Sequence, residues 1–451
     1  MADQRDKAGR MRQQLQAVIQ AALRAVEPAR CVRRAAHRAR DALLVDGRRY
    51  DLARLRRAWV VGLGKAAPRM AVAVEEILGD RLAGGVVVTA AGCGVPTQRV
   101  EVVEASHPVP DQRSLAAGRR IVDTVQGAGE EDLVVVLISG GGSALLTLPA
   151  HGVSLEDLQA TGELLLRSGA GIQEVNAVRK HLSQVKGGQL ARLAAPAQVV
   201  ALILSDVPGD RLDAIASGPC VPDPTTFADA QRVLRRHGLW DQVPAAVRAR
   251  LAAGVAGRLP ETPKPGDPDL GRVHTVVIGS GGVAAEAARE EGERLGYPGI
   301  ILTTTLEGEA REVGRVVAAL AREMARWGRP IPAPGLVVAA GETTVTVRGP
   351  GKGGRNQELA LAAAAGIAGQ PGVVIAAVGT DGRDGPTDAA GGVVDGGTAA
   401  RIRGAGLEPW DCLAQNDAYT ALSTAGDLLI TGPTGTNVAD LCIVLVGRED
   451  R

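Results

Sequence analysis

Residues 133–146 read LVVVLISGGGSALL, an apolar run that ends in three glycines between two serines and continues into a helix-like segment. A run of Val, Leu and Ile without polar alternation is typical of a strand buried on both faces of a parallel sheet. Glycines directly after such a strand let the backbone approach a ligand closely. The segment therefore predicts an α/β unit with a ligand-binding loop at the carboxyl end of a strand.

The same plan recurs on both sides of this segment. Apolar runs at 59–64, 85–89 and 199–204 predict further strands of a parallel sheet that helices cover on both faces. Beyond a proline-rich stretch at 259–271, which predicts a domain boundary, strands are expected at 275–278, 300–304, 336–340, 373–378 and 441–446. Residues 344–347, TVTV, alternate in polarity and predict an antiparallel or edge strand, so the second sheet is expected to be mixed.

Composition excludes several classes of partner. The 51 Lys and Arg residues against 50 Asp and Glu leave a net charge of +1, and only eight residues are aromatic, so nucleic-acid binding is not expected. Residues 359–380 carry no charge, but a Gln-Pro-Gly turn at 370–372 divides them into a helix and a strand rather than a membrane span. Five scattered cysteines predict reduced thiols in a cytoplasmic protein.

An amphipathic helix near the N-terminus is predicted by the spacing of Leu15, Val18, Ile19, Ala22, Leu23 and Val26. Its arginine-rich face is expected to be solvated and not to bind a membrane.

Two loops predict capture of small anions. GLGKAA at 62–67 follows a strand and matches a dinucleotide-binding pattern, but no acidic residue follows the next strand, and Lys65 places a cation in the turn. Phosphate or carboxylate binding is therefore favoured over NAD, with a simple tight turn as the alternative. In the second loop, at 139–143, backbone amides and serine hydroxyls are expected to cradle phosphate oxygens. No Walker A pattern occurs in the chain.

Rare residues single out further positions. The chain has 6 Lys against 45 Arg and only four Asn, yet all four Asn and four of the Lys occur in polar loop motifs. In EVNAVRKHLSQVKGG at 174–188, Asn176, Arg179 and Lys180 share a helix face that predicts binding of an anion, and Lys186 follows. A solvated cationic face is the alternative. The grouping of the rare Asn and Lys residues in these motifs predicts that the loops converge on one polar cleft.

Acidic residues follow other predicted strands. Asp206 and Asp210 in SDVPGD are expected to orient or deprotonate a hydroxyl or to hold a metal through water, although Asp210 suits a turn equally well. Arg355 begins a predicted helix after a glycine-rich loop and suits bidentate binding of a carboxylate or phosphoryl group. Three aspartates in GTDGRDGPTD at 379–388 are expected to position Mg²⁺. A lone His107 before proline is more often structural.

The chain resembles the glycerate 2-kinase family, whose C-terminal part is the MOFRL domain, and whose members have often been called hydroxypyruvate reductases. The likeness is carried by GLGKAA, SHPVPDQRS, LISGGGSALL, EVNAVRKHLSQVKGG, LSDVPGDRLDAIASGP, GGRNQELAL, GTDGRDGPTDAAGG and GPTGTNVADL, in the family's order. The resemblance implies ATP-dependent, Mg²⁺-assisted conversion of D-glycerate to 2-phosphoglycerate. It also implies two three-layer α/β domains, at 1–258 and 272–451, with a Rossmann-like first domain and the active site between them.

Each candidate residue then receives an expected role. The resemblance assigns catalysis to Lys65, Asp206 and Arg355. The residues expected to bind the cofactor are Gly64, Ser139, Gly140, Gly141, Gly142, Ser143 and Lys186. Asn176, Arg179 and Lys180 are expected to bind the substrate, and Asp381, Asp384 and Asp388 the metal. Two alternatives stay open, an NAD(P)H-dependent hydroxypyruvate reductase and a non-catalytic module that binds phosphorylated metabolites. The roles of Ser106, His107, Asn416 and Asn437 and the oligomeric state, with a homo-oligomer allowed, also stay open.

Overall fold

The computed structural model describes residues 2–448 and divides the chain into two compact units. The first unit comprises residues 28–205 and 210–278, and the second comprises residues 1–27, 206–209 and 279–451. This division differs from the predicted domains in where the chain passes between units. The proline-rich stretch at 259–271 lies inside the first unit, because the strand that follows it completes the first unit's sheet.

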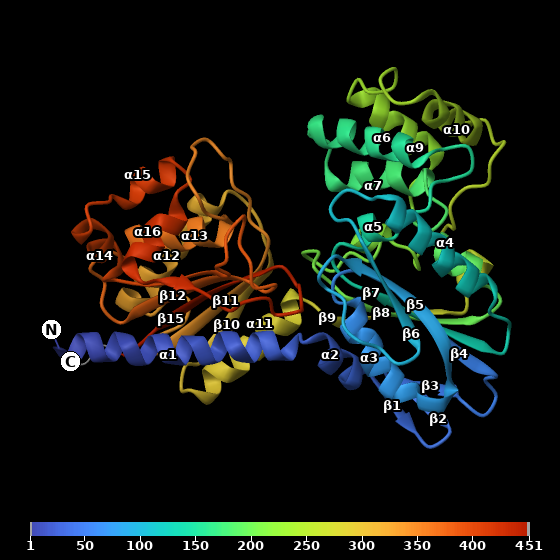
Figure 1. Ribbon diagram of the computed structural model, residues 1–451. Helices are drawn as coiled ribbons and strands as arrows, with labels where there is room; N and C mark the ends of the chain where they lie inside the picture. Colours follow the sequence, from blue (N-terminus) through green and yellow to red (C-terminus); the bar gives the residue numbers. More distant parts are fainter. Residues whose placement is uncertain (1, 449–451) are drawn as a thin grey trace. The chain divides into compact units, whose positions relative to one another are not determined.

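The first unit is built on a six-stranded sheet (Figure 1). Its strand order is β6 (Val100–Ala105), β5 (Leu82–Ala90), β4 (Arg57–Leu63), β7 (Asp132–Ile138), β8 (Gln198–Leu204) and β9 (Val273–Gly279). Every pairing from β6 to β8 is parallel. All seven residues of β7 are buried, as the unbroken apolar run predicts. The order reverses between β4 and β7, the arrangement of a Rossmann-like sheet.

Helices cover both faces of this sheet and form a second cluster beyond it. The helices nearest the sheet are α3 (Ala67–Leu78), α4 (Gln112–Gln126), α5 (Gly142–Leu145) and α8 (Gln189–Ala194), with α2 (Pro28–Ala35) packed on α3. At one end, α6 (Leu155–Arg167), α7 (Ile172–His181), α9 (Phe227–Arg236) and α10 (Ala245–Val255) gather around their own apolar core (Figure 1). A small antiparallel sheet is made by β1 (Ala36–Ala39), β2 (Ala42–Val45) and β3 (Arg48–Asp51).

The second unit contains a mixed six-stranded sheet, as predicted. Its order is β10 (Gly299–Leu306), β11 (Gly335–Gly341), β15 (Asp440–Val446), β12 (Val373–Gly379), β13 (Gly391–Asp395) and β14 (Leu428–Leu429). Only β10 and β11 pair in parallel, and β15 runs antiparallel to both of its neighbours. The end of β11, the end of β12 and the start of β15 therefore meet at one edge of the sheet.

Helices form the outer layers of the second unit (Figure 1). On one face lie α1 (Ala2–Ala25) and α11 (Gly281–Arg294), and on the other lie α12 (Ala310–Trp327) and α13 (Arg355–Gly366). Three shorter helices, α14 (Thr398–Gly404), α15 (Pro409–Ala414) and α16 (Ala418–Ala425), pack near α13. The predicted amphipathic helix is α1, and its Leu15, Val18 and Ala22 are fully buried.

One predicted strand is wrong. Residues 344–347 form no strand, and only an isolated bridge joins Thr344 to Glu309. The Thr346 amide donates instead to the Glu309 carboxylate at 3.1 Å, so a side chain replaces the backbone partner that a ladder would supply. The uncharged stretch at 359–380 contributes to α13 and β12, as predicted. Within residues 2–448 no helix has the length and apolar character needed to cross a membrane.

Candidate active site

In the first unit, the loops after β4 and β7 touch where the strand order reverses. The Lys65 amide donates to the Gly140 carbonyl at 3.0 Å, and the Ala66 amide donates to the Ser139 Oγ at 3.0 Å. Ligands of open α/β sheets bind beyond the carboxyl ends of the strands at such a switch point. The two loops that sequence analysis selected therefore form one continuous surface.

Gly64 allows this close approach. Its φ is +115°, and a Cβ at this position would lie 2.3 Å from the Ser139 Oγ. Neither the backbone conformation nor the space admits another residue. Close packing against Ser139 therefore requires glycine at position 64, whether or not Gly64 also makes the predicted contact with a cofactor.

The loop surface offers unused donors to an anion. Within residues 2–448 the amides of Gly140 and Gly141 donate to no acceptor, and the half-buried Lys65 ammonium group has no hydrogen bond or ion pair. Partly buried donors and an uncompensated cation are unfavourable unless a ligand or water satisfies them. These groups favour a phosphate or carboxylate at this edge of the sheet.

His107 also lies at this surface, and sequence analysis left its role open. A Cβ on Gly141 would be 3.0 Å from His107 Cδ2 and Nε2, so the ring edge lies against the glycine-rich loop, although much of the residue is exposed. Desolvation lowers the pKa of His107, and the positive charge of Lys65 lowers it further. A single histidine before proline carries no spacing signal, so only the fold could place it here.

Helix α7 carries the three residues predicted to bind the substrate, and their surroundings differ. Asn176 is buried, and the Arg179 guanidinium makes no hydrogen bond or ion pair within the described chain. Burial lowers the pKa of Arg179. Lys180 differs, because its side chain is 2% exposed and its Nζ lies 3.2 Å from Asp223 Oδ1. This internal ion pair neutralises the Lys180 charge within the protein, and the predicted contact of Lys180 with the substrate stays a prediction.

Lys186 supports the glycine-rich loop from within. Its Nζ donates to the carbonyl oxygens of Ser143 at 2.7 Å and Leu146 at 3.0 Å, at the end of α5. Desolvation lowers the pKa of Lys186 to about 7, and the neighbouring Arg179 charge acts in the same direction. The ammonium group is thus directed at two protein carbonyls and supports the loop, and the predicted contact of Lys186 with the cofactor stays a prediction.

A buried chain of hydroxyl and amide groups joins the loop to α7. Ser143 Oγ lies 2.8 Å from Ser217 Oγ, and Ser217 Oγ donates to Asn176 Oδ1 at 2.9 Å. No local sequence pattern points to Ser217, because 41 residues separate it from Asn176. The motif that contains it, LSDVPGDRLDAIASGP, had drawn attention only to its aspartates.

In the second unit, Arg355 begins α13 at the sheet edge where β11, β12 and β15 meet. Its guanidinium donates to both carboxylate oxygens of Asp440, at 2.5 and 3.0 Å, and lies 2.6 Å from Glu342 Oε1. Burial and the neighbouring carboxylates raise the pKa values of Asp440 and Glu342. Three of the five N–H donors of Arg355 are engaged in this way, which leaves two for a ligand.

The three aspartates predicted to bind a metal have different surroundings. Asp384 accepts from the amides of Asn356 and Gln357 at the start of α13, Asp388 accepts from the Tyr419 hydroxyl, and Asp381 Oδ1 accepts from an amide in its own turn. Within residues 2–448 no three His, Cys, Asp or Glu side chains form a group that could hold a metal ion. The structure does not bring the predicted trio together, because Asp384 and Asp388 serve the local fold.

The remaining predicted polar residues have separate places. Asp206 is half-buried, two residues after the end of β8, in the short segment 206–209 assigned to the second unit. Asn416 Oδ1 accepts from the amides of Arg348 and Gly349, and its Nδ2 donates to Glu358. Asn437 Oδ1 accepts from the amide two residues later. Asn416 and Asn437 therefore stabilise loops, and scarcity alone was a poor guide to their function.

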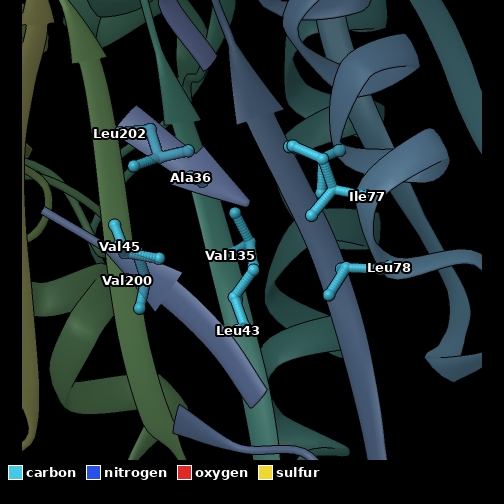
Figure 2. A pocket seen from close by; sticks show the side chains of 9 residues that line it. Ala36, Leu43, Val45, Ile77, Leu78, Val135, Val200 and Leu202 are labelled. Atoms are coloured by element: carbon cyan, nitrogen blue, oxygen red, sulfur yellow. The ribbon is translucent and has the colours of Figure 1, made fainter. Parts of the chain in front are cut away.

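An apolar pocket of the first unit lies apart from these groups (Figure 2). Side chains of the small sheet, α3 and the main sheet line it, namely Ala36, Leu43, Val45, Val74, Ile77, Leu78, Val135, Val200 and Leu202. None of these side chains carries a polar group that could orient a charged ligand. The glycine-rich loops, and not this pocket, are the candidate active site of the first unit.

Two family models match the chain. A domain of unknown function, DUF4147, matches residues 14–252, and the MOFRL family matches residues 335–440. The first match lies mostly in the first unit, and the second lies within the second unit.

Curated relatives match most of the chain. A glycerate 2-kinase of Pyrococcus horikoshii is 46% identical over 94% of this chain and 95% of its own length. A D-glycerate 2-kinase of Thermotoga maritima is 48% identical over 87% of this chain and 91% of its own length. A putative hydroxypyruvate reductase of Agrobacterium vitis is 47% identical over 87% of each chain.

Solved structures share the fold. The crystal structure of a glycerate kinase from Thermotoga maritima has a TM-score of 0.87 and 44% identity, covering 97% of this chain and 100% of its own. A crystal structure from Pyrococcus horikoshii has the same TM-score and 45% identity, covering 97% of this chain and 99% of its own.

Proposed function

The chain belongs to the glycerate 2-kinase family, and we propose that it transfers the γ-phosphoryl group of ATP to the 2-hydroxyl of D-glycerate. The products are 2-phosphoglycerate and ADP. The observation that supports this proposal most directly is the pair of uncompensated cations, Lys65 and Arg179, in the unit that carries the free amides of Gly140 and Gly141. Both substrates are anions, and such groups suit them.

Phosphoryl transfer depends mainly on alignment and charge neutralisation. In this proposal the amides of the glycine-rich loop bind phosphate oxygens, and Lys65 neutralises charge on the transferring group. Arg179 and the Asn176 amide hold the glycerate carboxylate. Asp206 orients the 2-hydroxyl and accepts its proton, while the two free N–H groups of Arg355 bind a phosphoryl or carboxylate oxygen.

Mg²⁺ suits the oxygen-rich sheet edge of the second unit. When bound, it would neutralise charge on the β- and γ-phosphate oxygens. Asp381 is the best protein partner among the predicted aspartates, because only its Oδ1 is engaged and because it adds to the charge around Glu342 and Asp440. Asp384 is already committed to two amides.

An ADP-release assay with D-glycerate, L-glycerate and hydroxypyruvate, followed by ³¹P NMR of the product, tests the function. We expect ADP with D-glycerate and a phosphorus signal coupled to the C2 proton. Lys65→Ala should lower turnover at least a hundredfold, because the transferring group loses its neutralising cation. Wild-type turnover by this variant would remove Lys65 from the mechanism.

The same assay separates the two alternatives. A reductase would oxidise NADH with hydroxypyruvate in the absence of ATP, but no acidic residue follows β5, where such enzymes bind the ribose. A non-catalytic module would show a higher melting temperature with ATP or glycerate and release no ADP. Either result would replace the proposed kinase reaction.

A further inference from the structure

Residues 216–218 adopt an unusual backbone conformation. Ala216 has φ 50° and ψ 23°, Ser217 has φ 61°, and Gly218 has φ 62° and ψ 54°. The left-handed region is unremarkable for glycine but unfavourable for alanine and serine. Non-glycine residues persist there only when the surroundings enforce it, and they cluster at functional sites.

The surroundings of this turn are rigid and buried. The Gly187 amide donates to the Ser217 carbonyl at 2.9 Å, and the Gly188 amide donates to the Gly218 carbonyl at 2.7 Å. Ser217 itself is 0% exposed. A glycine at position 217 would relieve the backbone strain, so the serine hydroxyl is the feature that needs an explanation.

Counting protons settles the direction of each hydrogen bond. A hydroxyl has one proton, and Ser217 donates its proton to Asn176 Oδ1 at 2.9 Å. In the 2.8 Å contact between the two hydroxyls, Ser143 must therefore be the donor. The proton of the Ser143 hydroxyl is therefore used within the protein, and the predicted contact of Ser143 with phosphate stays a prediction.

The same hydrogen bonds orient the side-chain amide of Asn176 and engage its oxygen but not its NH₂ group. Its Oδ1 accepts from Ser217, whereas its Nδ2 group donates to no acceptor within residues 2–448. Asn176 and Arg179 lie three residues apart on α7, a spacing that puts them on one helix face. The two unused donor groups are therefore suited to one anion.

We propose that Ser217 is a positioning residue that fixes the Asn176 amide with its NH₂ group directed at the glycerate carboxylate. The hydroxyl of Ser217 acts through Asn176 and does not touch the substrate. This assignment rests on the proposed kinase function. It gives a reason for a serine at a position where the backbone conformation favours glycine.

Kinetics of single and double variants test the assignment. Ser217→Ala should lower kcat/KM for D-glycerate at least tenfold, mainly through a higher KM, and should leave the KM for ATP within twofold of wild type. Asn176→Ala should lower kcat/KM at least as much. In the Asn176→Ala background, the further change Ser217→Ala should alter kcat/KM less than twofold, because the group that Ser217 orients is gone.

Two other variants distinguish positioning from a loss of stability. Ser217→Gly removes the hydroxyl and the strain together, so its melting temperature should equal or exceed that of Ser217→Ala while its KM for glycerate stays raised. Ser183→Ala is the matched control. Ser183 is 1% exposed, and its hydroxyl donates to the Leu148 carbonyl and accepts from the Val185 amide. Its kinetics should match wild type.

Three results would overturn the assignment. They are wild-type KM for glycerate in Ser217→Ala and Ser217→Gly, additive effects of Ser217→Ala and Asn176→Ala, or an equal rise in the KM for ATP. A wrong kinase function would show differently, since wild-type protein itself would then release no ADP with glycerate.

Discussion

The first unit contains cationic side chains of two kinds. Lys180 is buried with Asp223 at 3.2 Å, so its charge is neutralised inside the protein. Lys65 and Arg179 are only partly buried and have no carboxylate partner within the described residues. A cation without a counter-ion attracts an external anion more strongly than one already paired. Pairing, rather than residue type, therefore separates the candidate ligand-binding groups from the structural ones.

The charge on Lys65 should be measurable at His107. Lys65→Met removes a positive charge that lowers the pKa of His107, so that pKa should rise. NMR titration of the imidazole signals would measure it. His274 is the control, because burial and Arg48, and not Lys65, lower its pKa. Its ring is hydrogen-bonded to Tyr50, and its pKa should stay unchanged in the variant. An unchanged His107 pKa in the variant would mean that the ammonium group does not approach the ring.

The start of α13 depends on a carboxylate from a distant loop. Gly354 at the N-cap has no side chain to accept from the first amides, and Asp384 accepts from Asn356 at 3.1 Å and Gln357 at 2.8 Å. Desolvation raises the pKa of Asp384 to about 6 despite these bonds. The helix that begins with Arg355 is thus capped by a carboxyl group whose ionised form is destabilised by burial.

Ionisation of Asp384 should destabilise the second unit. Between pH 4 and 6 the folded carboxyl group retains a proton that the unfolded chain has lost, so the free energy of unfolding falls as the pH rises. The fall should be about 3 kcal/mol and complete by about pH 7. Denaturant unfolding of wild type and Asp384→Asn across this range would show it, because the free energy of unfolding of wild type should fall relative to that of the variant as the pH rises. Asp388→Asn is the control, because it removes an exposed carboxyl group with a lowered pKa and retains Asp384, so its free energy of unfolding should fall as that of wild type does.

A pH-independent difference between wild type and Asp384→Asn would contradict this assignment. It would show that the folded and unfolded states bind the proton equally well.

The chain does not divide at a single point, because α1 packs on the unit formed mostly by residues after 279. Arg12 of α1 makes ion pairs with Asp395 and with Asp427, the latter at 2.9 Å. Arg401 also pairs with both carboxylates. The N-terminal helix is therefore an integral part of the second unit, joined to it by charges as well as by its apolar face.

Arg12→Ala should destabilise the second unit by about 2 kcal/mol, because the two carboxylates lose one of the two arginines that pair with both of them. Hydrogen exchange should quicken in β12 and β13 and stay unchanged in β4 and β7. Arg33→Ala, which breaks an exposed ion pair with Glu76 in the first unit, should have little effect on either sheet. Equal acceleration in both sheets would mean that α1 does not stabilise the second unit selectively.

Local patterns were sufficient for much of this protein. Apolar runs such as 133–138 predicted buried strands, the spacing along 15–26 predicted α1, and glycines after strands predicted the loops of the first unit. The quoted motifs also predicted the family. These inferences succeed because strand burial, helix periodicity and loop glycines depend on neighbouring residues. The strand predicted from the alternating stretch at 344–347 is absent, because the Glu309 carboxylate accepts the hydrogen bond that a neighbouring strand would otherwise accept.

Only the tertiary structure decided which charged and polar groups are available to a ligand. Lys180 lies 43 residues from Asp223, Ser217 lies 41 residues from Asn176, and Arg355 lies 85 residues from Asp440. No local pattern predicts such partners, because hydrogen bonds and ion pairs form between groups that folding brings within about 3 Å. The sequence identified the residues capable of the chemistry, and long-range contacts separated those that remain free from those already engaged.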